Sequence, residues 1–225
     1  MAESQITFEA ELVSFLKSRG ADFVSFTDIS QLSVKKNRQY PRAIIFGIAL
    51  SPAFIRKLSS NNQISEDEFH ITEAKTDRLA DYMADYLTLK GYSAFSQSEN
   101  NLSWTACYNE VTKTTPLPHK TIAGLSGMGW IGKHNLLVSP DFGSAISMCT
   151  VLTDAPVKTL LHTPVSSQCG DCTICRDICP VKAIKGTIWN IGIQRDELLD
   201  VYRCNSCLKC LALCPWTQKY AEKTL

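Results

Sequence analysis

The sequence predicts a layered domain of the α/β or α+β class over residues 1–163, followed by a small cysteine-rich module over residues 164–225. Three observations support this division. Apolar residues in the first part of the chain alternate between helical spacing and short continuous runs. Eight of the ten cysteines follow residue 168. A hydrophobic content of 44% with 20% charged residues is typical of a folded domain with its own core.

Two long helices are expected in the first domain. Residues 4–19 carry apolar side chains at helical spacing, and Gly20 follows as a suitable stop. A second helix is expected over residues 65–90, because Ser65 and Glu68 form the pattern of a capping box at its start.

The strands of this domain are expected between and after the helices, in short runs rich in apolar and β-branched residues. One of these runs is continuously apolar, which is typical of a strand buried on both faces. The expected strands are residues 22–26, 42–50 (the continuous run), 92–96, 135–139 and 144–153. A short helix over residues 119–126 and a glycine-rich loop precede the last two.

Composition argues against several classes of protein. The formal net charge is +1 and no basic run stands out, so nucleic acid is an unlikely partner. The N-terminus carries acids and lacks the apolar core of a signal peptide. No stretch approaches the roughly 18 apolar residues of a membrane span. A cytoplasmic protein without a membrane partner is therefore expected, and its ten cysteines indicate metal or redox chemistry rather than a disulfide scaffold.

The cysteines fall in two runs of the same form, C-x₂-C-x₂-C-x₃-C-P. Residues 169–180 read CGDCTICRDICP and residues 204–215 read CNSCLKCLALCP. This is the spacing of bacterial ferredoxins with two 4Fe–4S clusters, in which the fourth cysteine of each run binds the cluster of the other. The first predicted ligand set is Cys169, Cys172, Cys175 and Cys214, and the second is Cys204, Cys207, Cys210 and Cys179. A Cys₄ zinc site is the alternative, but such sites seldom use a third cysteine at the same step.

A glycine-rich loop at residues 127–132 reads GMGWIG and matches the letters of the dinucleotide fingerprint. That fingerprint follows a strand and opens a helix, whereas this loop is expected to follow a helix and precede a strand. Two interpretations stay open. The glycines serve tight turns, or they let the backbone approach a large flat cofactor. The candidate cofactor-binding residues are Gly127, Gly129, Trp130, Gly132, Lys133, His119 and His134.

The stretch LPHKTIAGLSGMGWIGKHNLLVSPDFGSAISMCTVLTDAPV, followed by the first cysteine run, resembles epoxyqueuosine reductases and the related reductive dehalogenases. The chain would be a short, divergent member of that group. The resemblance implies a nitroreductase-like domain that binds cobalamin, joined to a two-cluster ferredoxin-like module. It also implies that the clusters pass single electrons to the cobalt, which reduces a substrate, and that a ferredoxin or flavodoxin supplies the electrons. A flavin is the alternative cofactor, because nitroreductase-like domains commonly hold one.

The chain departs from epoxyqueuosine reductases where the resemblance implies a proton-donating aspartate. Lys113 stands three residues before Pro116, and the nearest carboxylate is Glu110. The sequence stops at Leu225, so the C-terminal extension that the resemblance implies for members that handle tRNA is not expected here. No catalytic residue is assigned, and a small-molecule substrate or a corrinoid is expected in place of a tRNA nucleoside. The alternative is a non-catalytic electron-transfer partner, or a reductive activator of another redox or corrinoid protein.

Overall fold

The computed structural model describes residues 7–60 and 67–223 of the chain. The chain forms two compact units, each built from segments far apart in the sequence. The first, here the sheet unit, comprises Met1–Ile48, Thr72–Ile122 and Ser147–Leu161. The second, here the cysteine unit, comprises Ala49–Ile71, Ala123–Ile146 and His162–Leu225. The cysteine-rich segment thus shares its unit with two earlier segments, and the predicted division at residue 163 stays a prediction.

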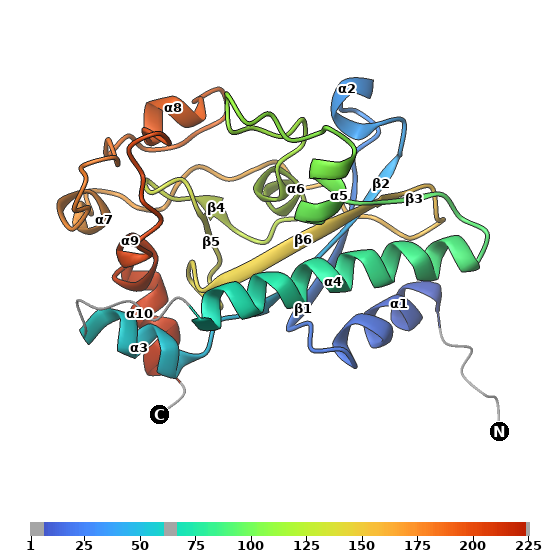
Figure 1. The fold of residues 1–225 in the computed structure, drawn as a ribbon, viewed down its shortest axis with the longest axis horizontal. Helices are drawn as coiled ribbons and strands as arrows, with labels where there is room; N and C mark the ends of the chain where they lie inside the picture. The colour runs from blue at the N-terminus through green and yellow to red at the C-terminus, as the bar shows by residue number, and fades with distance from the viewer. Residues whose placement is uncertain (1–6, 61–66, 224–225) are drawn as a thin grey trace. The chain divides into compact units, whose positions relative to one another are not determined.

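A four-stranded sheet with the strand order β1-β2-β6-β3 lies in the sheet unit (Figure 1). The strands are β1 (Phe23–Asp28), β2 (Arg42–Ala49), β3 (Ala94–Ser96) and β6 (Ile146–Thr153). β1 runs antiparallel to β2, with Phe23 opposite Gly47, and β3 runs antiparallel to β6, with Ala94 opposite Thr153. All four strands lie where the sequence predicts them, and the apolar runs of β2 and β6 occupy the two central positions.

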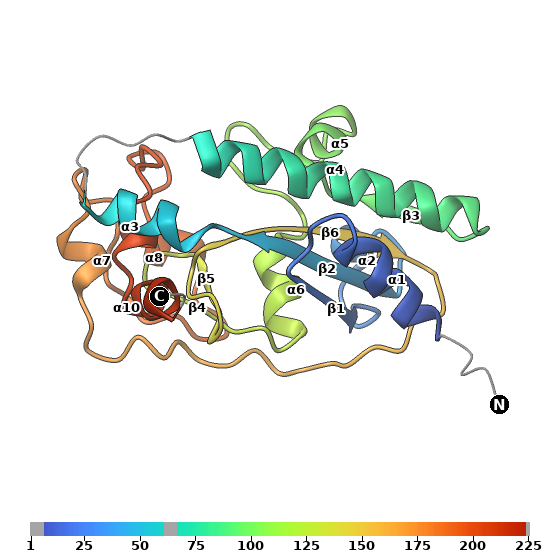
Figure 2. The same cartoon turned by 90° about the horizontal axis from the view of Figure 1, so that it is seen from below.

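Two helices, α1 (Phe8–Lys17) and α4 (Asp67–Leu89), pack against one face of this sheet (Figure 2). α1 begins after Thr7, whose Oγ1 accepts a hydrogen bond from the Ala10 backbone N–H at 3.3 Å. The shared core consists of Leu12, Leu16, Leu79, Met83 and Leu87 from the helices, with Ile44, Phe46, Cys149 and Val151 from the strands. Both predicted long helices are confirmed, although Ser65, the predicted cap of the second, lies outside the described residues.

Three shorter helices also have residues in the sheet unit. They are α2 (Val34–Asn37), α5 (Glu99–Trp104) and α6 (His119–Leu125). α6 confirms the helix predicted before the glycine-rich loop. α2 and α5 were not predicted, because four to six residues are too few for a helical period to emerge from the sequence.

A second hydrophobic core lies in the cysteine unit. It is built by α3 (Pro52–Ser60), α9 (Lys209–Ala212) and α10 (Pro215–Glu222). α3 and α10 lie side by side (Figure 1), and Arg56 Nη1 donates a hydrogen bond to the Ala221 carbonyl oxygen at 2.7 Å. The buried members are Leu50, Phe54, Ile55, Leu58, Ala145, Leu208, Leu211, Ala212 and Ala221. An early segment of the chain therefore supports the helix that follows the last cysteine.

The glycine-rich loop contains a short strand that the sequence does not predict. β4 (Trp130–Ile131) pairs antiparallel with β5 (Leu137–Val138), and Trp130 lies opposite Val138. β5 falls within the predicted run of residues 135–139. Two paired residues carry no periodicity of their own, so β4 depends on its partner strand rather than on local sequence.

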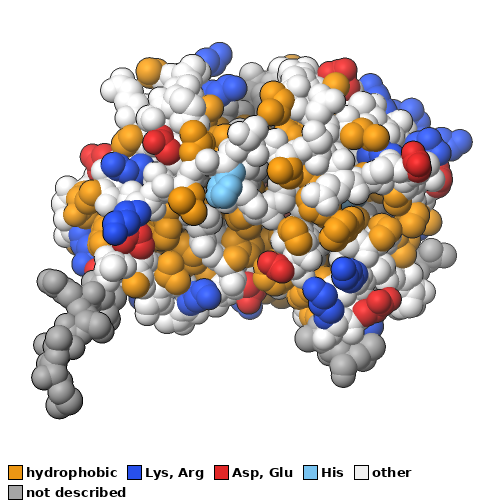
Figure 3. Space-filling view, turned by 180° about the vertical axis from the view of Figure 1, so that it is seen from behind, with side chains coloured by type: hydrophobic (Ala, Val, Ile, Leu, Met, Phe, Trp, Pro, Cys, Tyr) orange, Lys and Arg blue, Asp and Glu red, His pale blue; other side chains and the backbone are white. Residues whose placement is uncertain are grey.

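None of the described helices is long and apolar enough to cross a membrane. On the face seen in Figure 3, hydrophobic side chains lie among Lys, Arg, Asp and Glu side chains. Charges of both signs occur on this face, in keeping with the formal net charge of +1.

Candidate functional site

The first predicted set of cysteines surrounds one cavity of about 100 Å³ in the cysteine unit. Three of the four come from the first cysteine run, and Cys214 comes from the second. The residues that line the cavity are Cys169, Cys172, Cys175, Cys214, Lys133, His134, Pro215 and Trp216. The fold therefore brings together four thiols whose outermost members are 45 residues apart in the sequence.

Local structure explains how these thiols are presented. The Cys172 N–H donates to the Cys169 carbonyl oxygen at 3.0 Å, which closes a tight turn, and Cys175 lies in α7 (Ile174–Asp177). Cys214 is the N-cap of α10, and Pro215 occupies the first helical position. Proline suits that position because it has no N–H to leave unpaired and its φ angle is already helical.

The surroundings of the Cys175 thiol disfavour its ionised form. Burial raises the pKa of the Cys175 thiol to about 11, with further contributions from the negative charges of Cys169, Cys214 and Cys172. Four thiolates would repel one another at this site unless a cation were placed among them. The donor set is therefore suited to a positively charged metal core.

The second predicted set shows the same electrostatic pattern. Burial raises the pKa of the Cys210 thiol to about 12, and Cys207, Cys175, Cys204 and Cys179 raise it further by charge repulsion. Three of these four neighbours are the predicted co-ligands of Cys210. The fourth, Cys175, belongs to the first set, so the two sets interact electrostatically.

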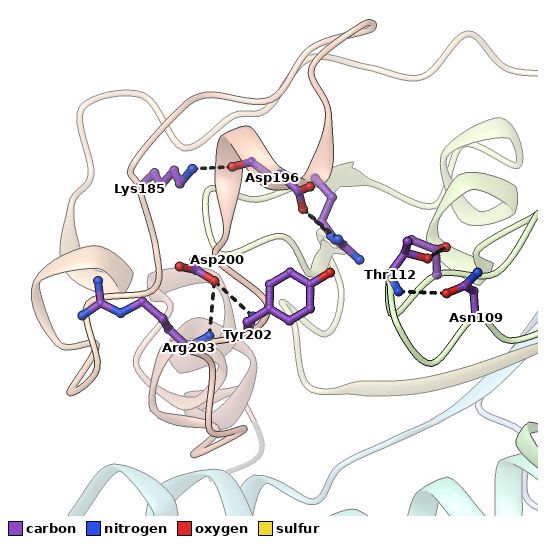
Figure 4. Close-up of polar contacts among 9 residues, drawn as sticks. Asn109, Thr112, Lys185, Asp196, Asp200, Tyr202 and Arg203 are labelled. Atoms are coloured by element: carbon purple, nitrogen blue, oxygen red, sulfur yellow. Dashed lines mark hydrogen bonds and ion pairs between the residues drawn. The ribbon is translucent and has the colours of Figure 1, made fainter.

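The segment between the cysteine runs is fixed by its own polar contacts (Figure 4). Asp200 Oδ1 accepts hydrogen bonds from the backbone N–H groups of Tyr202 at 3.1 Å and Arg203 at 3.2 Å. The Cys204 N–H donates to the Asp200 carbonyl oxygen at 3.2 Å. The Asp200 turn thereby positions Cys204. α8 (Arg195–Leu198) precedes this turn, and Lys185 Nζ donates to the Asp196 carbonyl oxygen at 2.6 Å.

Within residues 7–60 and 67–223, no three His, Cys, Asp or Glu side chains converge closely enough to hold a single metal ion. A 4Fe–4S cluster requires a different arrangement. Each of its four thiolates binds a separate iron, so the sulfur atoms surround the cluster core rather than meet at one point. The first four predicted ligands line one cavity, as a cluster held by those four residues requires.

The predicted cofactor-binding glycines are packed against the chain's own atoms. A Cβ atom at Gly129 would overlap the carbonyl oxygen of Val138. At Gly132 it would lie 2.7 Å from the His134 ring, and at Gly127 it would lie 2.9 Å from the ring of His162. Gly127 also has a φ angle of +75°, which favours glycine. These contacts within the cysteine unit account for the three glycines, and their predicted role toward a second cofactor stays a prediction.

Trp130, Lys133 and His134 are buried in the cysteine unit. The Trp130 ring packs edge-on against Trp216, with ring centroids 4.8 Å apart. His134 Nε2 lies 3.2 Å from Ser144 Oγ. Lys133 and His134 line the cavity of the first cysteine set, so two of the predicted cofactor-binding residues lie beside predicted cluster ligands.

His119, the remaining candidate, belongs to the sheet unit and lies at the start of α6. Its Nδ1 is 2.9 Å from Thr150 Oγ1, and the Thr150 hydroxyl donates to Gln97 Oε1 at 2.5 Å. Gln97 Nε2 in turn donates to the Leu117 carbonyl oxygen at 2.9 Å, which fixes the orientation of the amide. Since the Thr150 proton is used toward Gln97, His119 Nδ1 carries a proton and Nε2 is the unprotonated nitrogen.

A cavity of about 550 Å³ lies beside His119 in the sheet unit. Its walls combine four carboxylates with polar and apolar groups, and burial raises the pKa of one carboxylate, Asp77, above its usual value. The lining residues are Glu73, Asp77, Gln97, Glu99, Leu102, Ser103, Tyr108, Glu110, Thr115, His119, Ser147 and Met148. Sequence reasoning named His119 but missed the four carboxylates of this cavity, although Glu73 and Asp77 recur at helical spacing.

His119 is expected to make stability depend on pH. Burial lowers the pKa of His119 from 6.5 to about 4. Between these values the unfolded chain binds a proton that the folded chain does not, so the free energy of unfolding falls as pH decreases. The expected loss from this group between pH 7 and pH 5 is about 2 kcal/mol. Urea unfolding at both pH values should show a smaller loss in His119→Gln, whereas His70→Gln, at an exposed position on α4, should keep the wild-type loss. Equal losses in all three proteins would contradict the expectation.

No protein-family model matches the chain. An epoxyqueuosine reductase from Aliivibrio fischeri is 32% identical over 127 residues, which cover 50% of this chain and 34% of that protein. The chain thus spans about a third of the length of this relative. These residue identities confirm the resemblance to epoxyqueuosine reductases that the sequence motifs indicate.

Solved structures extend the comparison to the fold. A structure of epoxyqueuosine reductase with an epoxyqueuosine-modified tRNA-Tyr stem loop matches with a TM-score of 0.60 and 16% identity, covering 93% of this chain and 65% of that one. A reductive dehalogenase structure, described as suggesting a mechanism for B12-dependent dehalogenation, matches with a TM-score of 0.69 and 19% identity. That match covers 98% of this chain and 34% of the other. At these identities the matches establish a shared mixed α and β fold.

Proposed function

We propose that this chain, which is similar to epoxyqueuosine reductases and reductive dehalogenases, is an iron–sulfur oxidoreductase. Electrons pass one at a time through two 4Fe–4S clusters to a cofactor or substrate held by the N-terminal domain. The cysteine-rich segment, residues 164–225, acts as a two-cluster ferredoxin-like module, and residues 1–163 hold the acceptor. The observation that carries this proposal is the cavity of about 100 Å³ that is lined by three cysteines of the first run and by Cys214 of the second.

The chain's own residues bind and shield the clusters in this proposal. Cys169, Cys172, Cys175 and Cys214 bind one cluster as thiolates, and the second set binds the other. When bound, each cluster accepts and releases a single electron. Pro215 and Trp216 line the first cavity and exclude water from it. The negative charge of Cys175, a ligand of the first set, also raises the pKa of the Cys210 thiol of the second set, which supports two clusters close enough to exchange an electron.

The acceptor in this proposal is a second cofactor or a small molecule. Cobalamin is the first candidate, because a structural relative is described as B12-dependent, and a flavin is the second. The three glycines predicted to cradle such a cofactor meet the chain's own atoms and leave no open surface at those positions. That part of the predicted site does not fit a corrinoid, so no step is assigned to one. The cavity beside His119 has a volume suited to a small molecule.

The partners follow from the same reasoning. An electron donor such as a ferredoxin or flavodoxin supplies the clusters, and a small molecule or a corrinoid is the acceptor. A structural relative has been solved with a tRNA stem loop, so the expectation that nucleic acid is no partner has no support from the comparisons. Thiols that must stay reduced to bind iron are in keeping with a cytoplasmic location.

A second candidate function is a non-catalytic electron carrier or a reductive activator of another redox or corrinoid protein. The observation that favours it is the absence of a carboxylate three residues before Pro116, where Lys113 stands. In that case the cavity of the sheet unit contributes nothing to electron transfer. Catalysis and electron carriage differ in whether a second cofactor binds to the chain.

An anaerobic reconstitution with iron and sulfide tests the proposal. We expect about eight iron atoms per chain and reversible reduction, because two 4Fe–4S clusters are bound. Cys107 lies outside both cysteine runs, so the Cys107→Ser variant should retain the full iron content. The loaded protein is then mixed with cobalamin or with flavin and separated by gel filtration. A corrinoid or flavin that co-elutes supports the oxidoreductase, and clusters that cycle without either support the carrier. Failure to retain iron contradicts both.

A further inference from the structure

Lys133 is a buried cation held close to the first cysteine set. Lys133 is only 6% exposed to solvent. Its Nζ donates hydrogen bonds to the carbonyl oxygens of Gly170 at 2.7 Å and Cys172 at 2.9 Å. Both carbonyls belong to the turn that presents Cys169 and Cys172. Lys133 therefore ties the glycine-rich loop to the first cysteine turn.

The position of this ammonium group is unusual for a lysine. Buried lysines are rare unless they are paired with a negative charge. Among the described residues, the ion pairs found elsewhere in the chain do not include Lys133. Lys133 does line the cavity shared by Cys169, Cys172, Cys175 and Cys214. The four thiols share that cavity with Lys133, and they carry negative charge when they bind a metal.

We propose that Lys133 is a positioning residue that raises the reduction potential of the cluster bound by Cys169, Cys172, Cys175 and Cys214. The inference rests on the proposed function, since it requires that cluster. Reduction adds one electron to the cluster and so adds one negative charge beside the ammonium group. Attraction between opposite charges in a buried site stabilises the reduced state more than the oxidised state. The two backbone hydrogen bonds hold the charge against the turn that carries Cys169 and Cys172.

A redox titration of the reconstituted protein with dithionite, followed by electron paramagnetic resonance, tests this role. Wild type should show two one-electron steps. In Lys133→Gln, which removes the charge but keeps hydrogen-bond donors, one step should shift to lower potential and the other should stay in place. A tenfold change in the reduction equilibrium, about 59 mV for one electron, is the expected size of the shift. Lys133→Arg, which keeps the charge, should retain most of the wild-type potential.

Lys182→Gln is the matched control, because it removes the same charge from an exposed lysine of the same unit. Solvent screens that charge, so both steps should stay near their wild-type positions. Unchanged potentials in Lys133→Gln, or an equal shift in Lys182→Gln, overturn the inference.

Two further results separate this inference from its premise. If wild type binds no iron, the proposed function fails and the inference falls with it. If wild type binds both clusters but Lys133→Gln loses iron, Lys133→Arg decides the outcome. Recovery of the iron and of the wild-type potential in Lys133→Arg, with no recovery in Lys133→Met, supports a role for the charge. Recovery in Lys133→Met overturns it.

Discussion

Cys214→Ala is expected to lose about half of the bound iron while the chain stays folded. Cys214 lies in the second cysteine run, yet its thiol lines the cavity formed by Cys169, Cys172 and Cys175. Alanine removes one of four ligands from that set and leaves the other set complete. Iron analysis and electron paramagnetic resonance of the reconstituted variant measure the loss. Cys107→Ala, which removes a thiol of the sheet unit, should keep the full iron content.

Paired variants reveal which cysteines share a cluster. If Cys214 and Cys169 bind the same cluster, the double variant Cys214→Ala/Cys169→Ala should retain about as much iron as Cys214→Ala alone. Cys214→Ala/Cys204→Ala should lose nearly all iron, because it damages both sets. The reverse result, with most iron lost in the first pair and half retained in the second, would show that each run binds its own cluster.

Gly143→Ala is expected to destabilise the cysteine unit strongly and to reduce its iron content. Gly143 has a φ angle of +58°, and an added Cβ would overlap the backbone of Trp216 and Thr217 at the start of α10. The close approach is reinforced by Ser144, whose N–H donates to Thr217 Oγ1 at 2.9 Å. Relief of the overlap would move the helix whose N-cap is Cys214. The expected cost is about 4 kcal/mol of unfolding free energy, at the high end for a single substitution.

Gly192→Ala separates backbone strain from steric overlap. Gly192 lies in the same unit with a φ angle of +105°, but nothing lies within 4 Å of an added Cβ. Its cost should stay near the 1–2 kcal/mol (roughly) of a left-handed alanine, and iron should be retained. Urea unfolding and iron analysis of both variants check the comparison. Equal losses of unfolding free energy in the two variants would show that the overlap with α10 adds nothing to the cost of backbone strain.

Local sequence patterns predicted the helices and strands whose formation depends on residues close together in the chain. The apolar run of residues 42–50 and the helical spacing of residues 4–19 gave β2 and α1, because each pattern reports one buried face. The spacing of the two cysteine runs also predicted that Cys214 groups with the first run, and Cys214 lines a cavity together with three cysteines of that run.

Such patterns do not predict contacts between segments that are far apart in the sequence. Lys133 was predicted to contact a cofactor, and only the fold shows that its Nζ binds the carbonyl oxygens of Gly170 and Cys172. The carboxylates that share a cavity with His119 were missed for a similar reason. They come from α4, α5 and a turn near Glu110, and no single stretch of sequence records that they face one space.

The interleaved composition of the cysteine unit has a consequence for how the protein is made. α3 leaves the ribosome long before α10, and the hydrogen bond from Arg56 to Ala221 closes a loop of 165 residues. Until that closure, Phe54, Ile55 and Leu58 lack the part of their apolar packing that the C-terminal helices supply. Expression of residues 164–225 alone would leave those helices without α3. The cysteine unit is therefore expected to complete its folding only after α10 has been synthesised.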